Sequence, residues 1–232
     1  MATSGTAAWT LNRDQVIKGA LRKLGVLPSG GSPTANQTSD AAEALNGLVK
    51  SLHGKGMPLW KITSTTFTVT DGTASYTVGP SQTINVATPL RVLQAFYTPE
   101  DGNNTPMNVY NRYDFSDLPN TAEGTPVNLY YQPLRITGVV KLWPTPTDST
   151  TQITIHYEAP FEDMNSASDD FDFPSYWITA LIYNLAWLLA PEFGLPVQER
   201  TALAQEAKYW TDEALSIGAE EGSLFLQPNR EM

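Results

Sequence analysis

Hydrophobic positions in the first part of the chain recur every three to four residues, which is the spacing of helices with one apolar face. The first such stretch runs from about residue 12 to 24 and opens on a capping-box pattern of Asn12 and Gln15. The second runs from about residue 38 to 53, and a Pro-, Gly- and Ser-rich loop separates the two. We therefore predict an antiparallel helix pair.

The pattern then changes to alternation of apolar and polar residues, which predicts strands. Asp71-Gly72 separates alternating runs at 67–69 and 76–78 and is typical of a hairpin turn. A short helical turn is expected at about 113–118. Five further strands are predicted from Thr, Val, Ile and Tyr enrichment, at about 90–97, 107–111, 127–132, 138–143 and 152–157.

Helical spacing returns after Phe173-Pro174, in a segment that is apolar on almost all sides and stops at Pro191. A last helix is predicted at about 196–217. The predicted fold class is α+β: an antiparallel helical bundle of about four helices with an inserted antiparallel β lobe and an extended C-terminal tail.

This layout predicts four parts of the chain. They are an N-terminal helical pair at 1–59, an inserted β-rich lobe at 60–160, the C-terminal helices that complete the bundle at 161–218, and a docking tail at 219–232. The tail places Leu224, Phe225 and Leu226 in a row outside any amphipathic element. Such a row either folds back onto the body or inserts into a partner.

Composition and charge narrow the function. Only 16% of residues are charged and the formal net charge is −10, with no basic face for gripping nucleic acid. The chain has no cysteine, which excludes a disulfide framework, a thiol nucleophile and Cys-ligated metal. Residues 1–10 carry no signal-peptide pattern, and the apolar stretch at 176–190 is shorter than the ~20 residues of a membrane span. A soluble protein made in the cytoplasm, without a cofactor or a metal, is expected.

Candidate chemistry is sparse. His53 and His156 stand far apart in the sequence, and neither has another His or a Cys nearby with which to form a catalytic or metal site. The acidic run at 162–172 breaks the calcium-loop pattern and is interpreted as a solvated linker. Glu158 and Glu162 are the one carboxylate pair worth considering for a cell-wall hydrolase. We predict no catalytic residue and no enzyme.

An aromatic group on the predicted strands offers a binding alternative. Tyr130, Tyr131 and Trp143 lie on neighbouring predicted strands and could form a patch that faces a partner. Core packing is the ordinary role of such residues. The patch motivates an alternative function, a carbohydrate-binding or other tail-associated binding module built on the β lobe.

Five segments, in order, resemble the head-to-tail adaptors of bacteriophages, also called packaged-DNA stabilisation or tail-accessory factors. The opening one reads Gln-Val-Ile-Lys-Gly-Ala-Leu-Arg-Lys-Leu-Gly-Val-Leu, and the similarity extends over about residues 10–215. The segments are 15–27, 44–49, 74–80, 139–146 and 181–194.

The resemblance implies a structural protein of the virion neck, where a ring of usually twelve copies lies under the portal protein. Such a ring closes the DNA exit channel after packaging and provides the attachment site for a downstream tail or nozzle protein, which the β lobe would face. Genomic DNA would pass through the lumen without specific binding, and no membrane is involved. The tail would dock on the portal through Leu224, Phe225, Leu226, Gln227 and Pro228.

Overall fold

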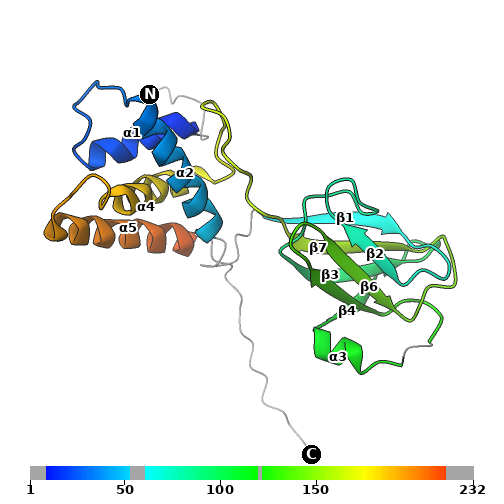
Figure 1. Ribbon diagram of the computed structural model, residues 1–232. Coiled ribbons are helices and arrows are strands. Elements are labelled where there is room, and N and C mark those ends of the chain that lie inside the picture. Colours follow the sequence, from blue (N-terminus) through cyan, green and yellow to red (C-terminus); the bar gives the residue numbers. More distant parts are fainter. Residues whose placement is uncertain (1–8, 53–60, 120–121, 218–232) are drawn as a thin grey trace, which may run out of the picture. The chain divides into compact units, whose positions relative to one another are not determined.

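The computed structural model describes residues 9–52, 61–119 and 122–217 (Figure 1). Contacts along the chain divide it into two compact units. The first, the helical unit, takes residues 1–59 and 161–232, and the second, the β unit, takes residues 60–160.

The helical unit is built from segments at both ends of the chain. Its first helix begins with the predicted capping box: Asn12 accepts from the backbone N–H of Gln15, whose side chain accepts in turn from the N–H of Asn12. The second helix starts earlier than expected because Thr34 and Gln37 make the same reciprocal pair of bonds. The elements are α1 (Arg13–Lys23), α2 (Ala35–Leu52), the 3-10 turn η3 (Ser175–Trp177), α4 (Ile178–Leu189) and α5 (Val197–Ile217).

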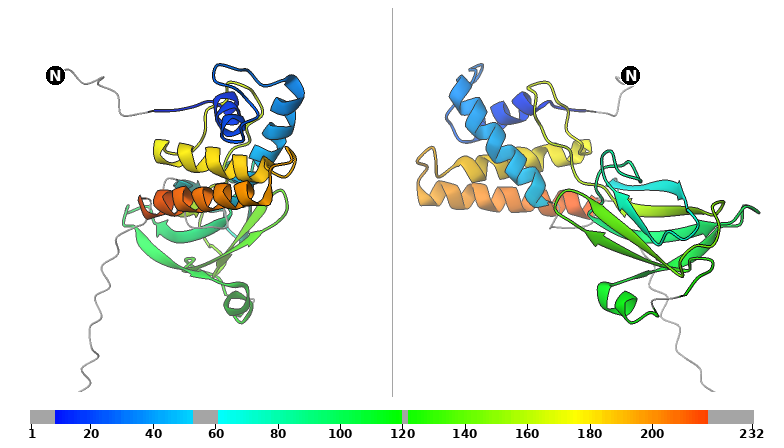
Figure 2. Two further views of the ribbon diagram at one scale, coloured as in Figure 1. Left: turned by 90° about the vertical axis from the view of Figure 1, so that its left-hand side faces the viewer. Right: turned by 45° about the vertical axis from the view of Figure 1, so that its right-hand side comes forward.

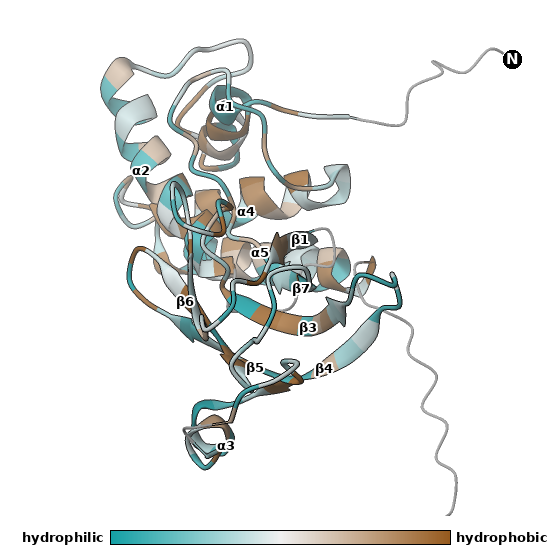
Figure 3. Cartoon of the chain, turned by 90° about the vertical axis from the view of Figure 1, so that its right-hand side faces the viewer, coloured by the Kyte–Doolittle hydropathy of each residue, from teal (hydrophilic) through white to brown (hydrophobic). Residues whose placement is uncertain are grey.

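Helix α4 is the centre of this unit. It packs against α1, α2 and α5, while α5 packs against α4 and η3. Leu181, Leu185 and Leu189 are fully buried, and Figure 3 shows the hydrophobic character of α4. Burial of each such side chain stabilises the fold by about 1.5–3 kcal/mol. No helix of the described ranges is both long and apolar enough to cross a membrane.

The β unit is a seven-stranded sheet in the order β1-β7-β3-β4-β5-β6-β2. Alternate residues of its strands point to a single core, which includes Leu129, Val140, Ile153 and Ile155. The strands are β1 (Ile62–Thr68), β2 (Ser75–Val78), β3 (Arg91–Thr98), β4 (Thr105–Tyr110), β5 (Asn128–Pro133), β6 (Gly138–Trp143) and β7 (Gln152–Glu158), and the helix α3 (Arg112–Ser116) lies between β4 and β5.

The two edge strands of the sheet approach each other. Phe67 on β1 and Tyr76 on β2 have ring centroids 5.1 Å apart, although β1 and β2 are at opposite ends of the strand order. The sheet therefore curls into a half-barrel around its core.

The predicted fold class, a helical bundle of about four helices with an inserted antiparallel β lobe, is wrong. The second unit is a seven-stranded mixed half-barrel, because β4 and β5 pair in parallel. Parallel neighbours need a crossover, and the chain between them, which contains α3, provides one. The described helices of the first unit surround α4 instead of forming an antiparallel four-helix bundle.

The predicted hairpin is also wrong in its pairing. Asp71-Gly72 does form a turn, with Gly72 at φ +72°. The strands that flank it nevertheless pair elsewhere, β1 with β7 and β2 with β6. The turn joins the two edges of the half-barrel.

Candidate functional site

A groove runs between α4 and α5, which lie side by side in the helical unit (Figure 2). Its volume is about 420 Å³ and its walls are mainly apolar. Trp187 stands at its side with 45% of its surface exposed. The groove is lined by Asn184, Trp187, Ala204, Ala207, Lys208, Thr211, Asp212 and Leu215.

The floor of the groove is a buried polar contact between the two helices. The side-chain amide of Asn184 donates to the hydroxyl of Thr211 at 2.7 Å and to the carbonyl of Ala180 at 2.8 Å. Thr211 in turn donates to the carbonyl of Ala207. These bonds satisfy polar atoms that burial would otherwise penalise, and they fix the register of α4 against α5.

An aromatic cluster occupies the other flank of α5. The ring of Tyr183 on α4 stacks on Trp210 with centroids 6.4 Å apart, and Tyr209 meets Trp210 edge-on at 5.2 Å. The ammonium of Lys23 on α1 lies 4.8 Å from the Tyr183 ring centroid. Tyr209 remains 58% exposed. The helical unit thus has two unlike surfaces that a neighbouring protein could cover.

The β unit separates the three aromatics that the sequence grouped together. Tyr131 points into the core, where its hydroxyl donates to the carbonyl of Pro89 and burial raises its pKa to about 12. Tyr130 and Trp143 belong to the opposite face of the sheet. Tyr130 packs on Phe115 of α3 at 5.5 Å, and the indole N–H of Trp143 donates to a carbonyl of the same crossover.

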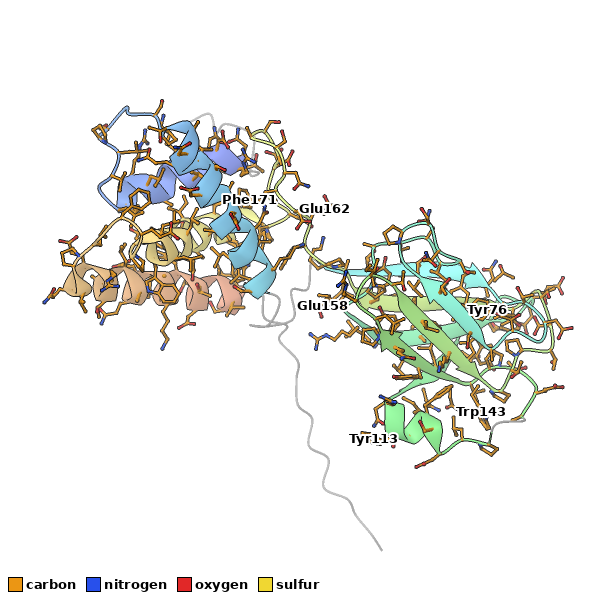
Figure 4. The ribbon with its side chains drawn as sticks, viewed as in Figure 1. Tyr76, Tyr113, Trp143, Glu158, Glu162 and Phe171 are labelled. Carbon is orange, nitrogen blue, oxygen red and sulfur yellow. The ribbon has the colours of Figure 1, made fainter. Side chains whose placement is uncertain are left out.

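The most exposed aromatic of the described chain is Tyr113, on α3. Its surface is 83% exposed, and α3 projects from the sheet as one short turn of helix (Figures 1 and 4). Asn111 caps this turn by accepting from the backbone N–H groups of Tyr113 and Asp114. Tyr130 and Trp143, by contrast, are half-buried against the crossover that carries α3.

The carboxylate pair considered for hydrolysis does not form a solvent-filled site. Glu158 is 2% exposed and accepts from the guanidinium of Arg91, with 2.6 Å between Nε and Oε2. Glu162 is exposed and belongs to the other unit. A buried carboxylate paired to an arginine has the geometry of a structural ion pair.

The acidic run and His156 serve local structure. Asp163 pairs with Lys50 of α2 at 2.8 Å, and Asp169 accepts from the backbone N–H of Ser166. His156 packs edge-on against Phe96, while His53 lies outside the described residues. Within the described ranges no three His, Cys, Asp or Glu side chains gather as a possible metal site.

One strongly held acid stabilises a turn. Asp148 accepts from the backbone N–H groups and the hydroxyls of Thr150 and Thr151, in the Pro-rich turn between β6 and β7. The N–H of Thr151 contributes most to lowering the pKa of this carboxyl. The group is therefore a turn-forming acceptor rather than a proton donor.

Comparison with known proteins identifies the family of the chain. A family model described as SU10 adaptor protein matches residues 14–230, which includes both units. The chain belongs to the SU10 adaptor protein family. No curated protein matches it. As a phage adaptor-type protein, this SU10 adaptor has a structural role in the virion, which agrees with the predicted absence of an enzymatic role.

One predicted site of this SU10 adaptor is not described by the structure, and one site in the structure was not predicted. The expected docking residues Leu224, Phe225, Leu226, Gln227 and Pro228 lie outside the described residues. The groove on α4 and α5 was missed, because the segment that contains Trp187 was described only as apolar on almost all sides. A helix that is apolar on all sides is ordinarily covered all round, so the pattern alone does not mark the side of α4 that stays exposed.

Proposed function

We propose that this SU10 adaptor forms a ring under the portal, where it closes the DNA exit channel after packaging and provides the attachment site for the tail. The observation that carries this proposal is the family match over residues 14–230, since it spans nearly the whole chain. In this proposal the protein belongs to the virion neck.

The surfaces of the helical unit suit a ring. Copies in a ring meet head to tail, so two different surfaces of each copy must be complementary. The groove beside Trp187 and the aromatic cluster of Tyr183, Tyr209 and Trp210 lie on opposite flanks of α5. Both combine apolar area with a polar rim, which is the usual make-up of a protein interface.

The other proposed contacts follow from the rest of the chain. The tail at 219–232 docks on the portal through Leu224, Phe225 and Leu226, and the β unit faces the downstream tail protein with Tyr113 and the neighbouring Tyr130 and Trp143. The net charge of −10 lets genomic DNA pass without adhering, because like charges repel.

Removal of residues 223–232 tests the portal contact. Burial of three large apolar side chains provides about 1.5–3 kcal/mol each before ordering costs, so truncation is expected to weaken portal binding by more than about 100-fold. The measurement is binding of purified adaptor to the cognate portal, with unfolding curves to show that the fold is retained. The matched control changes Glu220 and Glu221 to Gln and keeps the apolar row. Portal binding of the truncated chain at full affinity contradicts this role of the tail.

A further inference from the structure

The groove between α4 and α5 is an apolar surface without a covering element among the described residues. Trp187 is 45% exposed beside it, and Leu215 is half-buried at its other end. Ala204 and Ala207 leave the space that larger side chains on α5 would fill. Its volume of about 420 Å³ lies in the range, about 300–1,000 Å³, of pockets that hold small ligands or a few side chains.

The chain itself continues from the end of this groove. Leu215 lines the groove and α5 ends two residues later, at Ile217. From Leu215 back to Ala204 the helix rises by about 17 Å. Residues 218–223 can extend over about 20 Å, and the glycines at 218 and 222 permit the chain to reverse. The apolar row that follows can therefore reach any part of the groove of its own copy.

The groove and the segment 224–226 are both apolar. Leu224, Phe225 and Leu226 are consecutive large apolar residues with no amphipathic element around them. The groove offers mainly apolar walls, with one cation, Lys208, and one anion, Asp212, among its lining residues, so the match rests on the apolar surface. A contact between the groove and an apolar segment removes apolar surface of both from water.

We propose that in the free subunit the segment 224–226 occupies the α4–α5 groove of its own chain. This inference rests on the proposed function, in which the same segment later docks on the portal. The groove holds the apolar row until the portal competes for it. While the row is bound there, free copies cannot associate through the groove or through the row. Portal binding then exposes Trp187 and its groove for a neighbouring copy.

Thiol labelling tests the contact, because the chain has no cysteine of its own. Ala204→Cys places one thiol on the groove wall, and the rate of its reaction with a small maleimide is measured in the free protein. The rate is compared with that of the same variant carrying Leu224→Ser, Phe225→Ser and Leu226→Ser. With the native tail we expect reaction about tenfold slower, which corresponds to a docked population of about 90%.

Control positions fix the interpretation. Gln205→Cys, on the exposed side of α5, is expected to react at one rate with either tail, and Asp212→Cys on the groove rim repeats the test if Ala204→Cys perturbs the fold. Equal rates for Ala204→Cys with both tails overturn the proposal. Protection that rises with protein concentration also overturns it, because the tail then comes from a second copy. The assay contains no portal, so its failure is distinct from failure of portal binding.

Discussion

Replacement of Arg91 by methionine is expected to lower the free energy of unfolding of the β unit by about 3 kcal/mol. Glu158 is 2% exposed, and its Oε2 lies 2.6 Å from Nε of Arg91. Without the guanidinium the carboxylate stays buried with no opposite charge, which costs about 3–5 kcal/mol in comparable pairs. We expect the lower end, because the Arg91 side chain is 51% exposed and water can enter in its place.

The double variant Arg91→Met with Glu158→Leu separates charge from packing. It is expected to recover most of the lost stability, because no buried charge is left without a partner. Unfolding in urea should be monitored through the hydrogen exchange of amides in β3 and β7. This probe reports on the β unit alone, since the two units need not unfold together. A single variant as stable as the native chain shows that the pair contributes nothing to the fold.

Leu181→Ala on α4 is expected to destabilise the helical unit by about 2–5 kcal/mol. The Leu181 side chain is fully buried at the centre of the unit, so truncation removes transfer free energy and leaves a cavity. Leu188→Ala is the matched control on the same helix: that side chain is 41% exposed, and its loss should cost less than about 1 kcal/mol.

The measurement is hydrogen exchange of α4 amides together with thermal unfolding of both variants. Equal losses at Leu181 and Leu188 contradict the difference in burial between these two positions of α4.

Most individual elements could be predicted from the sequence, because they depend on local physics. Helix starts follow from caps, as at Asn12, and strands follow from alternation, as in β6 and β7, whose starts match the prediction. The start of α2 was misplaced because Thr34 with Gln37 is an equally good cap that lies about one turn upstream of the predicted start at residue 38.

The arrangement of the strands could not be predicted, since it depends on distant partners. The Asp71-Gly72 turn has the local chemistry of a hairpin, but its flanking strands pair with strands about 60–90 residues away. Gly138 shows the same limit: a Cβ there would overlap the Tyr131 ring, which packs across the neighbouring strand. Nothing local indicates that close approach.

Site features, too, could be predicted only where they depend on the local sequence and not on tertiary packing. The sequence places the two histidines far apart and singles out the apolar row at Leu224, which lies outside the described residues. It does not indicate that Trp187 is exposed, because exposure depends on how few helices surround α4. It also groups Tyr131 with Tyr130, although consecutive residues of a strand point to opposite faces.

We propose that this SU10 adaptor forms a ring under the portal. Electron microscopy of the purified chain mixed with its cognate portal tests that claim most directly. The account predicts a ring of added density, coaxial with the portal channel and attached at its DNA exit, in which each copy has one helical unit and one β unit. Portal particles without added density, under conditions in which the adaptor is folded and in excess, contradict it.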